Sequence, residues 1–239
     1  MALTYKKAGV DISKIKQSQK AIGKLIASTH KLQKKAKIAH GFGHYAGIVE
    51  IPGGKMLATH TDGVGTKVVI ANMMKKYNTI GIDCVAMNVN DIICIGATPI
   101  SFVDYIAANK NDVPIFKKIV EGLVTGAKKS SMPIVGGETA IMPDVIEGKG
   151  FAFDLAGMVV GLVEKKELVL GNKIKSGDVI IGANSTGIHS NGYSLARKAL
   201  LNKYSIKDKV KGVGIIGDAL LKPTDRKSTR LNSSHVRTS

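Results

Sequence analysis

Glycines cluster between segments with helical spacing of apolar residues and segments with a strand pattern. This arrangement restricts the fold more than any other feature of the sequence. The chain has 27 glycines in 239 residues, many of them clustered between apolar runs. Apolar side chains recur at helical spacing over Ser18–Lys37 and Thr79–Gly96, with Ser18 as the expected N-cap of the first helix. Strand patterns cover Tyr45–Ile51, Met56–Thr61 and Ile100–Ala107. This alternation predicts an α/β protein of the α+β type rather than a helical bundle.

The second half of the chain continues the alternation. Asp112 is expected to cap a helix that ends near Ser130, followed by a short strand at Pro133–Gly136 and a longer strand at Phe151–Glu164. A polar, glycine-containing stretch, Lys165–Gly177, marks a boundary. Beyond it we expect a strand at Asp178–Ala183 and a helix at Tyr193–Lys203. The sequence thus predicts an N-terminal domain over residues 1–168 and an incomplete C-terminal domain over residues 169–224.

The last fifteen residues, 225–239, form a third part of different composition. They are rich in Ser, Thr and Arg, with Leu231 and Val236 as their two apolar residues. Such a segment buries too little surface to offset the entropy lost on ordering. We therefore expect a disordered tail, and we interpret it as a foreign sequence joined to a truncated protein.

Composition argues against several classes of protein. The formal charge of +17 is spread along the chain, and no basic run is interleaved with aromatic residues, so a nucleic-acid partner is not expected. No apolar stretch is long enough to span a bilayer and no signal peptide is recognisable, so a membrane partner is not expected either. Cys84 and Cys94 match no zinc or redox spacing, and we interpret them as reduced, buried thiols of a cytoplasmic protein.

The stretch His60–Lys67 carries the strongest chemical signal. It lies between a strand and a helix and contains a carboxylate (Asp62), two glycines (Gly63 and Gly65), a hydroxyl (Thr66) and a lysine (Lys67). Glycines let backbone N–H groups approach an anion, and a helix N-terminus adds positive potential. We expect the turn to face a phosphate, with Lys67 adding a charge and Asp62 holding Mg²⁺. The alternative is a tight turn with a capping Asp.

Two further carboxylates are candidates for the same cation. Asp91 lies on an otherwise apolar helix, and Glu138 follows two glycines where a strand is expected to end. Three carboxylates from separate element ends would suit Mg²⁺ bridging the phosphates of ATP. Taken singly, each of them is more often a cap or a surface charge.

Two loops are candidates for contact with the substrate. The loop that contains His189, Ser190, Asn191 and Gly192 runs into a helix, so its amides and hydroxyls can meet an anion, and His189 can bind phosphate or move a proton. The loop Gly41-Phe42-Gly43 follows a helix and precedes a strand. That order argues against a dinucleotide-binding loop and favours a lid.

Together these motifs resemble the phosphoribosylformylglycinamidine cyclo-ligase (aminoimidazole ribonucleotide synthetase) family. The resemblance covers residues 4–224 in order. The motifs that carry it are Tyr5–Ile12, Gly41–Gly43, Thr61–Lys67, Gly81–Asp83, Val85–Met87, Asn90–Ile92, Gly96–Pro99, Asp104-Tyr105, Gly136–Ala140, Met142-Pro143, His189–Leu195 and Leu220–Thr224.

The resemblance implies a fold, a reaction and roles for residues. It implies a mixed sheet that forms a barrel between two N-terminal domains of a homodimer. It implies ATP- and Mg²⁺-dependent closure of formylglycinamidine ribonucleotide to aminoimidazole ribonucleotide, with phosphorylation of the formyl amide oxygen followed by attack of the amidine nitrogen. Asp62, Asp91 and Glu138 would hold Mg²⁺-ATP, the loop His189–Gly192 the ribonucleotide phosphate, and Gly41–Gly43 would close over the site. His189 and Lys67 are the candidate catalytic residues.

The chain departs from the family pattern at several positions. The family usually has Gly in place of His40, His44 and His60, and Glu in place of Ile141. It continues after Thr224 with Arg and a long C-terminal domain. A thiamine-monophosphate kinase or selenophosphate synthetase is the related alternative, and a catalytically inactive fragment is the alternative from a different class.

Overall fold

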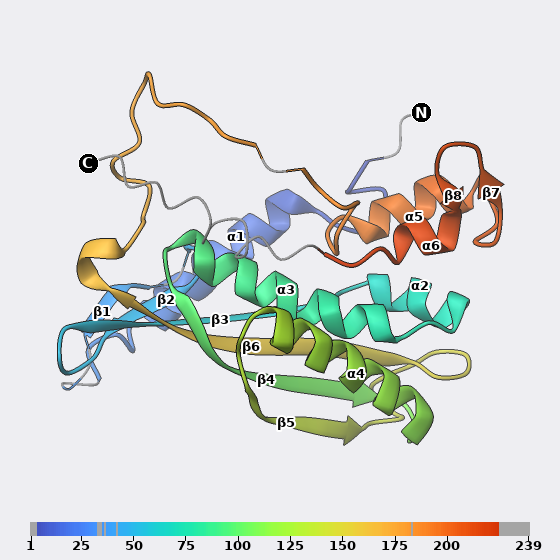
Figure 1. Ribbon diagram of the computed structural model, residues 1–239, viewed down its shortest axis with the longest axis horizontal. Coiled ribbons are helices and arrows are strands. Elements are labelled where there is room, and N and C mark those ends of the chain that lie inside the picture. Colours follow the sequence, from blue (N-terminus) through green and yellow to red (C-terminus); the bar gives the residue numbers. More distant parts are fainter. Residues whose placement is uncertain (1–3, 33–34, 36, 42, 183, 225–239) are drawn as a thin grey trace.

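The computed structural model describes residues 4–32, 35, 37–41, 43–182 and 184–224. Six strands form one mixed sheet in the order β1-β2-β3-β6-β4-β5 (Figure 1). The strands are β1 (Lys37–His40), β2 (Gly47–Glu50), β3 (Lys55–Gly63), β4 (Thr98–Ala108), β5 (Ile134–Ile141) and β6 (Phe153–Glu164). All neighbours run antiparallel except β4 and β5, which are parallel. The α/β prediction is confirmed.

The helix α4 (Val113–Lys129) is the crossover between the two parallel strands, and it packs beside α3 (Asn78–Cys94). Asp112 caps α4 as predicted, with its carboxylate accepting a hydrogen bond from the Ile115 N–H at 3.1 Å. Gly81 and Gly122 lie where the two helices touch, and a Cβ at either position would collide with the backbone of the other helix. The glycines therefore permit a close approach of α3 and α4.

Within the described part of the chain, helices cover one face of the sheet. Along β6, alternate residues from Phe153 to Val163 are buried beneath α3, while those between them are partly or fully exposed. The buried row joins Phe102 and Ile106 of β4 in the hydrophobic core. The opposite face carries Tyr105 and Met158, each 40% exposed. One face of the sheet is thus a core and the other an uncovered apolar surface.

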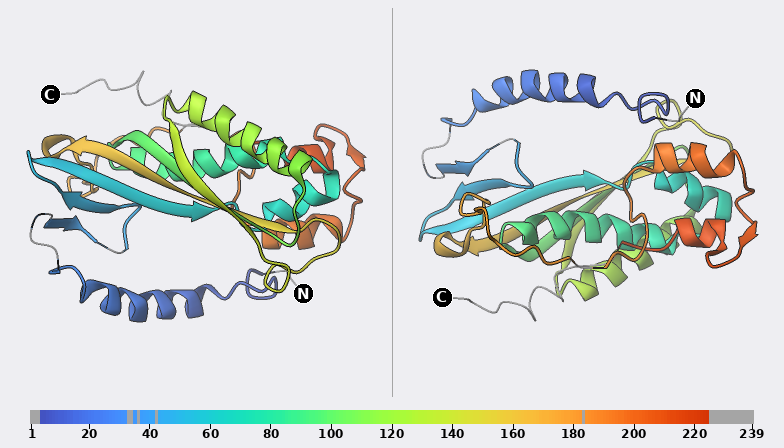
Figure 2. Two further views of the ribbon diagram at one scale, coloured as in Figure 1. Left: turned by 90° about the horizontal axis from the view of Figure 1, so that it is seen from below. Right: turned by 90° about the horizontal axis from the view of Figure 1, so that it is seen from above.

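The remaining elements lie around this two-layer unit. The helix α1 (Ile12–Ala27) stands beside β1 and β2 and contributes no buried residue (Figure 2). The helix α2 (Lys67–Met74) follows β3 directly, and the 3₁₀ turn η1 (Lys165–Glu167) follows β6. At the end of the sheet where α2 begins lie α5 (Tyr193–Leu201), β7 (Lys209–Val210), β8 (Gly214–Ile215) and α6 (Ile216–Leu220). Among the described residues no helix is long and apolar enough to cross a membrane.

The structure corrects three of the predicted elements. The first helix begins at Ile12, because the Asp11 carboxylate caps it with bonds to the N–H groups of Ser13 and Lys14; Ser18 is not its cap. The predicted strand at Asp178–Ala183 is absent from the described residues 178–182, whose Val179, Ile180 and Ile181 are 86%, 96% and 90% exposed. The strand predicted at Pro133–Gly136 instead extends to Ile141.

Both cysteines were expected to be buried. Cys84 is buried in α3, but Cys94, at the end of the same helix, is exposed. The expected tail, residues 225–239, lies outside the described residues.

We predict that Gly122→Ala lowers the free energy of unfolding by about 1–3 kcal/mol, because the added methyl group overpacks the α3–α4 contact. Gly182→Ala is the control, since its Cβ would meet no atom within 4 Å. Urea unfolding measures both. A Gly122→Ala variant as stable as Gly182→Ala would contradict the close packing of the two helices.

Candidate functional site

The turn after β3 exposes backbone at the start of a helix. The Gly63 N–H donates to Asp62 Oδ1 at 2.8 Å, and Val64 is buried with its N–H bonded to the Leu155 carbonyl. Gly65 adopts a φ of +64°, which suits glycine, and both Gly65 and Thr66 are exposed. Thr66 is the N-cap of α2 and makes no side-chain cap bond. The turn can therefore offer amide groups and the helix N-terminus to an anion.

Two of the predicted carboxylates lie close together beside this turn. Asp62 is the second-last residue of β3 and Asp91 lies on α3, where Asn88 Nδ2 donates to the Asp62 carbonyl at 3.2 Å. The imidazole of His60 reaches Asp91, with 3.2 Å between Nε2 and Oδ2. Burial raises the pKa of Asp91; His60 opposes the shift and the negative charge of Asp62 adds to it. Asp62 and Asp91 thus form an acidic pair, and a cation there would relieve their repulsion.

Glu138 does not join this pair. It lies within β5 rather than at a strand end, and it is exposed. In the register of the sheet, Asp62 pairs with Gly157, Gly157 pairs with Asp104, and Asp104 pairs with Gly137. Because successive side chains alternate between faces, Glu138 points to the face opposite Asp62. Among the described residues no three acidic, His or Cys side chains are arranged to hold a metal ion.

Asp104 is a half-buried carboxylate that the sequence analysis did not single out as a site residue. It shares the helix-covered face with Asp62, and burial raises its pKa. A Cβ on Gly137 would lie 2.5 Å from Asp104 Oδ1, so the neighbouring strand leaves room for the carboxylate. Burial also raises the pKa of the Cys84 thiol well above its usual range, and the negative charges of Asp104 and Asp62 add to this shift. The sequence signal for this residue is a single carboxylate within the strand pattern Ile100–Ala107.

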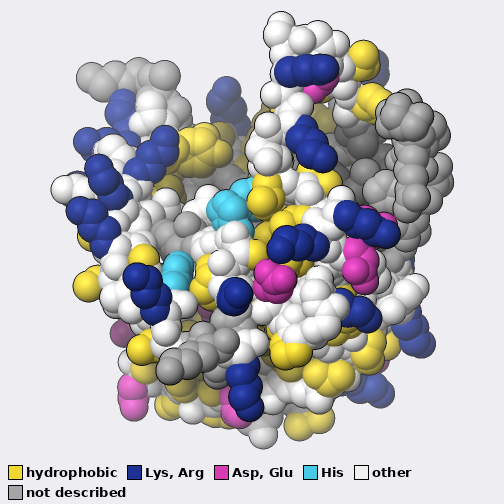
Figure 3. Space-filling model, turned by 90° about the vertical axis from the view of Figure 1, so that its left-hand side faces the viewer, with side chains coloured by type: hydrophobic (Ala, Val, Ile, Leu, Met, Phe, Trp, Pro, Cys, Tyr) yellow, Lys and Arg dark blue, Asp and Glu magenta, His cyan; other side chains and the backbone are white. Residues whose placement is uncertain are grey.

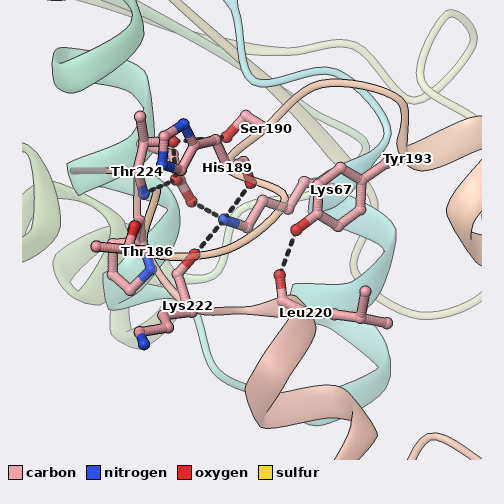
Figure 4. A network of polar contacts seen from close by, with 10 residues as sticks. Lys67, Thr186, His189, Ser190, Tyr193, Leu220, Lys222 and Thr224 are labelled. Atoms are coloured by element: carbon pink, nitrogen blue, oxygen red, sulfur yellow. Dashed lines mark hydrogen bonds and ion pairs between the residues drawn. The ribbon is translucent and has the colours of Figure 1, made fainter. Parts of the chain in front are cut away.

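Lys67 does not present its charge to the turn. The side chain is fully buried, and its ammonium lies 2.7 Å from Asp83 Oδ2. Figure 4 shows it among the residues of the loop before α5 and the segment after α6. It also donates to the carbonyls of His189 at 2.8 Å and Lys222 at 2.9 Å. The expectation that Lys67 supplies a charge to a phosphate is therefore corrected, because three acceptors already occupy its three donors. Burial lowers its pKa, and Asp83 opposes that shift.

The loop His189–Gly192 lies against the same turn. His189 has a φ of +62°, and its Nε2 is 3.0 Å from Ser185 Oγ. The Ser190 side chain is buried, whereas Asn191 is exposed. Gly192 is the N-cap of α5 with a φ of +74°. Ser194, in the first turn of α5, places its Oγ 3.4 Å from Thr66 Oγ1. The two predicted anion-binding segments are thus brought together.

A cavity of about 800 Å³ lies between α1 and the strands β1 to β3. Gly41 and Gly43 border it, as do His60 and Thr61 at its β3 wall. Phe42 lies outside the described residues. The loop follows strand β1 rather than a helix, which corrects its expected context. Histidine side chains are visible on the hollowed face amid many lysines (Figure 3). The cavity therefore brings the predicted lid loop close to the Asp62–Asp91 pair.

The sequence is similar to those of known proteins. The family model described as AIR synthase related protein, N-terminal domain, matches residues 43–163. The chain belongs to this family. The phosphoribosylformylglycinamidine cyclo-ligase of Methanosarcina barkeri is 49% identical over 225 residues, and that of Thermococcus kodakarensis is 46% identical over 224 residues. These matches cover 93% of this chain and 66% and 65% of the two relatives. The chain thus spans about two thirds of the length of its curated relatives.

Solved structures show a weaker similarity. The HypE–HypF complex aligns with 74% of this chain and 54% of its own, at 20% identity and a TM-score of 0.49. A similarity of this degree says nothing about activity.

We predict that Asp91→Asn raises stability increasingly as the pH rises from about 4 to 7, relative to the parent chain. An aspartate whose pKa is raised on folding is favoured in its protonated form, so stability is lost as the carboxylate ionises. The variant has no such ionisation. Urea unfolding at several pH values without divalent cations measures the difference. A variant that becomes relatively less stable over this range would show that the His60 ion pair outweighs burial.

Proposed function

We propose that the chain serves the reaction for which its relatives are named, the ATP-dependent closure of formylglycinamidine ribonucleotide to aminoimidazole ribonucleotide, with ADP and phosphate as the other products. The identity of 46–49% over 93% of the chain supports this proposal. ATP would transfer its terminal phosphoryl group to the formyl amide oxygen and leave as ADP. The amidine nitrogen would then attack the formyl carbon, and the phosphorylated oxygen would leave as phosphate. A cytoplasmic location, with neither nucleic acid nor membrane as a partner, belongs to the same proposal.

The observation that carries the proposal is the meeting of two anion-binding segments. The turn Gly63–Thr66 and the loop His189–Gly192 are joined by the contact between Thr66 and Ser194 and by the bond from Lys67 to the His189 carbonyl. A reaction between a nucleoside triphosphate and a ribonucleotide needs two phosphate sites close to each other. Holding both ligands in one geometry lowers the entropic barrier to the phosphoryl transfer.

Mg²⁺ fits the acidic pair beside the first of these segments. Asp62 and Asp91 supply the oxygen ligands that Mg²⁺ prefers. Burial raises the pKa of Asp91 and the charge of Asp62 adds to the shift, so a bound cation would stabilise both carboxylates in their ionised form. Bound there, the ion would neutralise charge on the phosphates of ATP. Asp91 would then exchange its contact with His60 for the ion. Glu138 lies on the opposite face of the sheet and is not part of this pair.

The other proposed roles concern the ribonucleotide. Ser190, Asn191 and Gly192 would hold its phosphate through backbone amides and side chains at the start of α5. His189 would bind the same group or move a proton, with Ser185 holding its Nε2. Gly41 and Gly43 border the cavity that reaches His60, and this position supports a loop that closes over the ligands and excludes water.

We predict that Asp62→Asn lowers turnover about 10²-fold or more while changing the unfolding temperature little, because the carboxylate acts on the ion rather than on the core. Asp154→Asn is the matched control, since the Asp154 carboxylate also accepts the N–H of the following residue, at 2.9 Å. Coupled ADP release, with detection of aminoimidazole ribonucleotide, measures turnover. Full activity in Asp62→Asn would remove Asp62 from the site, and release of neither product by the parent would contradict the proposed function.

We also propose that the chain forms a homodimer through the uncovered face of the sheet. Tyr105 and Met158 are each 40% exposed there, and Val103, Val160 and Leu162 are partly exposed beside them. An apolar surface spread over several strands is more extensive than scattered exposed side chains, and it is typical of a protein interface.

We predict that Met158→Asp converts the dimer into monomers, because a carboxylate at the centre of an apolar interface loses its hydration without gaining a partner. Leu25→Asp, at a position 74% exposed on α1, is the control and is expected to remain dimeric. Sedimentation velocity distinguishes the two states. A monomeric parent chain at micromolar concentration would refute the interface.

A further inference from the structure

The buried Lys67 ammonium connects four separate parts of the chain. It extends from the first residue of α2 to Asp83 on α3, to the His189 carbonyl in the loop before α5, and to the Lys222 carbonyl after α6 (Figure 4). Asp83 in turn accepts bonds from the N–H and the hydroxyl of Thr224, both at 2.7 Å. Lys67 and Asp83 are both fully buried. The pair is thus the centre of a closed polar network.

A fully buried ion pair lowers stability unless its geometry compensates for the lost hydration, so stability alone does not explain this pair. Removing two charges from water carries a penalty of several kcal/mol per ion, and replacing a buried pair by well-packed apolar residues of similar volume is often neutral or stabilising. A pair of this kind is better explained by the geometry it imposes. Here the imposed geometry is that of His189, whose φ of +62° is uncommon for a residue with a side chain. The bond from Lys67 holds the carbonyl of this residue.

Fixing that carbonyl also fixes the amide that follows it. In a trans peptide the C=O and the next N–H point in opposite directions, so the bond from Lys67 turns the Ser190 N–H away from the ammonium. The Ser190 hydroxyl lies 3.4 Å from Thr224 Oγ1, which is itself bonded to Asp83. Both the main chain and the side chain of Ser190 are therefore oriented by the network.

We infer that Lys67 and Asp83 are positioning residues that set the His189–Gly192 loop to receive a phosphate monoester. This inference rests on the proposed function and deepens it, because it names the chemical group that the network serves. Lys67 acts through the loop and does not touch the ligand. Lys67 is the first residue of α2, but its ammonium contacts the loop and not the turn next to Asp62.

The test compares double variants that leave no unpaired buried charge. Lys67→Met with Asp83→Asn removes the ion pair and the bond to His189. Lys67→Gln with Asp83→Asn retains donors on a shorter side chain. The control is Lys76→Met with Asp218→Asn, which removes an exposed Lys–Asp pair 3.3 Å apart, with each side chain 47% exposed. Circular dichroism and urea unfolding establish that each variant folds.

The measurement is the ratio of two affinities, determined by calorimetry for formylglycinamidine ribonucleotide and for the corresponding nucleoside without its phosphate. This ratio isolates the contribution of the phosphate. We expect the ratio of ribonucleotide affinity to nucleoside affinity to fall about tenfold or more in the Met/Asn variant and to fall less in the Gln/Asn variant. The control should have the ratio of the parent. The affinity for ATP should remain that of the parent in all three.

A folded Met/Asn variant with the parent ratio would overturn the inference and leave the pair a purely structural role. Failure of both double variants to fold would overturn it as well. If the parent binds neither the ribonucleotide nor the nucleoside, the proposed substrate is wrong. Inorganic phosphate is then the probe, and the inference still predicts that phosphate raises the unfolding temperature of the parent and of the control but not of the Met/Asn variant.

Discussion

Burial of a single face of the mixed sheet beneath α3 is the contact around which the rest of the molecule is arranged. It requires alternate residues of β6 to be apolar, and it requires α4 to approach α3 closely at Gly81 and Gly122. It also brings Asp91 on α3 beside Asp62 at the end of β3. The uncovered face follows from the same arrangement, since the same strands present Tyr105 and Met158 on their other side.

The carboxylates of the site fall into two electrostatic settings. Asp83 is fully buried and has partners on both oxygens, from Lys67 and from Thr224. Asp62 and Asp91 are half-buried and repel each other, with His60 giving partial relief. A satisfied carboxylate holds structure in place, whereas an under-compensated pair is poised to accept a cation. The division explains why two acidic residues on the same helix, Asp83 and Asp91, are assigned such different roles.

Much of the fold was predictable because its elements carry regular periods, as in α3, β4 and α4. The pairing of Asp62 with Asp91 was anticipated by their chemistry. The position of Glu138 was not, because a glycine pair that suggested the end of a strand lies inside β5. The burial of Lys67 was not predictable, since two of its acceptors, His189 and Lys222, are remote in sequence. The strand expected at Asp178–Ala183 has the right composition, but the described residues give it no neighbouring strand.

The order in which the chain is made gives the buried lysine a further significance. The sheet is complete once β6 has been synthesised. Two of the three acceptors of Lys67, however, come from residues 122 and 155 positions further along the chain, and Thr224 reaches back 141 positions to Asp83. Contacts of such separation form late, since long loops must close first. During synthesis Lys67 and Asp83 therefore have each other before the loop and the C-terminal segment arrive. The contacts that hold the loop His189–Gly192 in place therefore form after the sheet is complete.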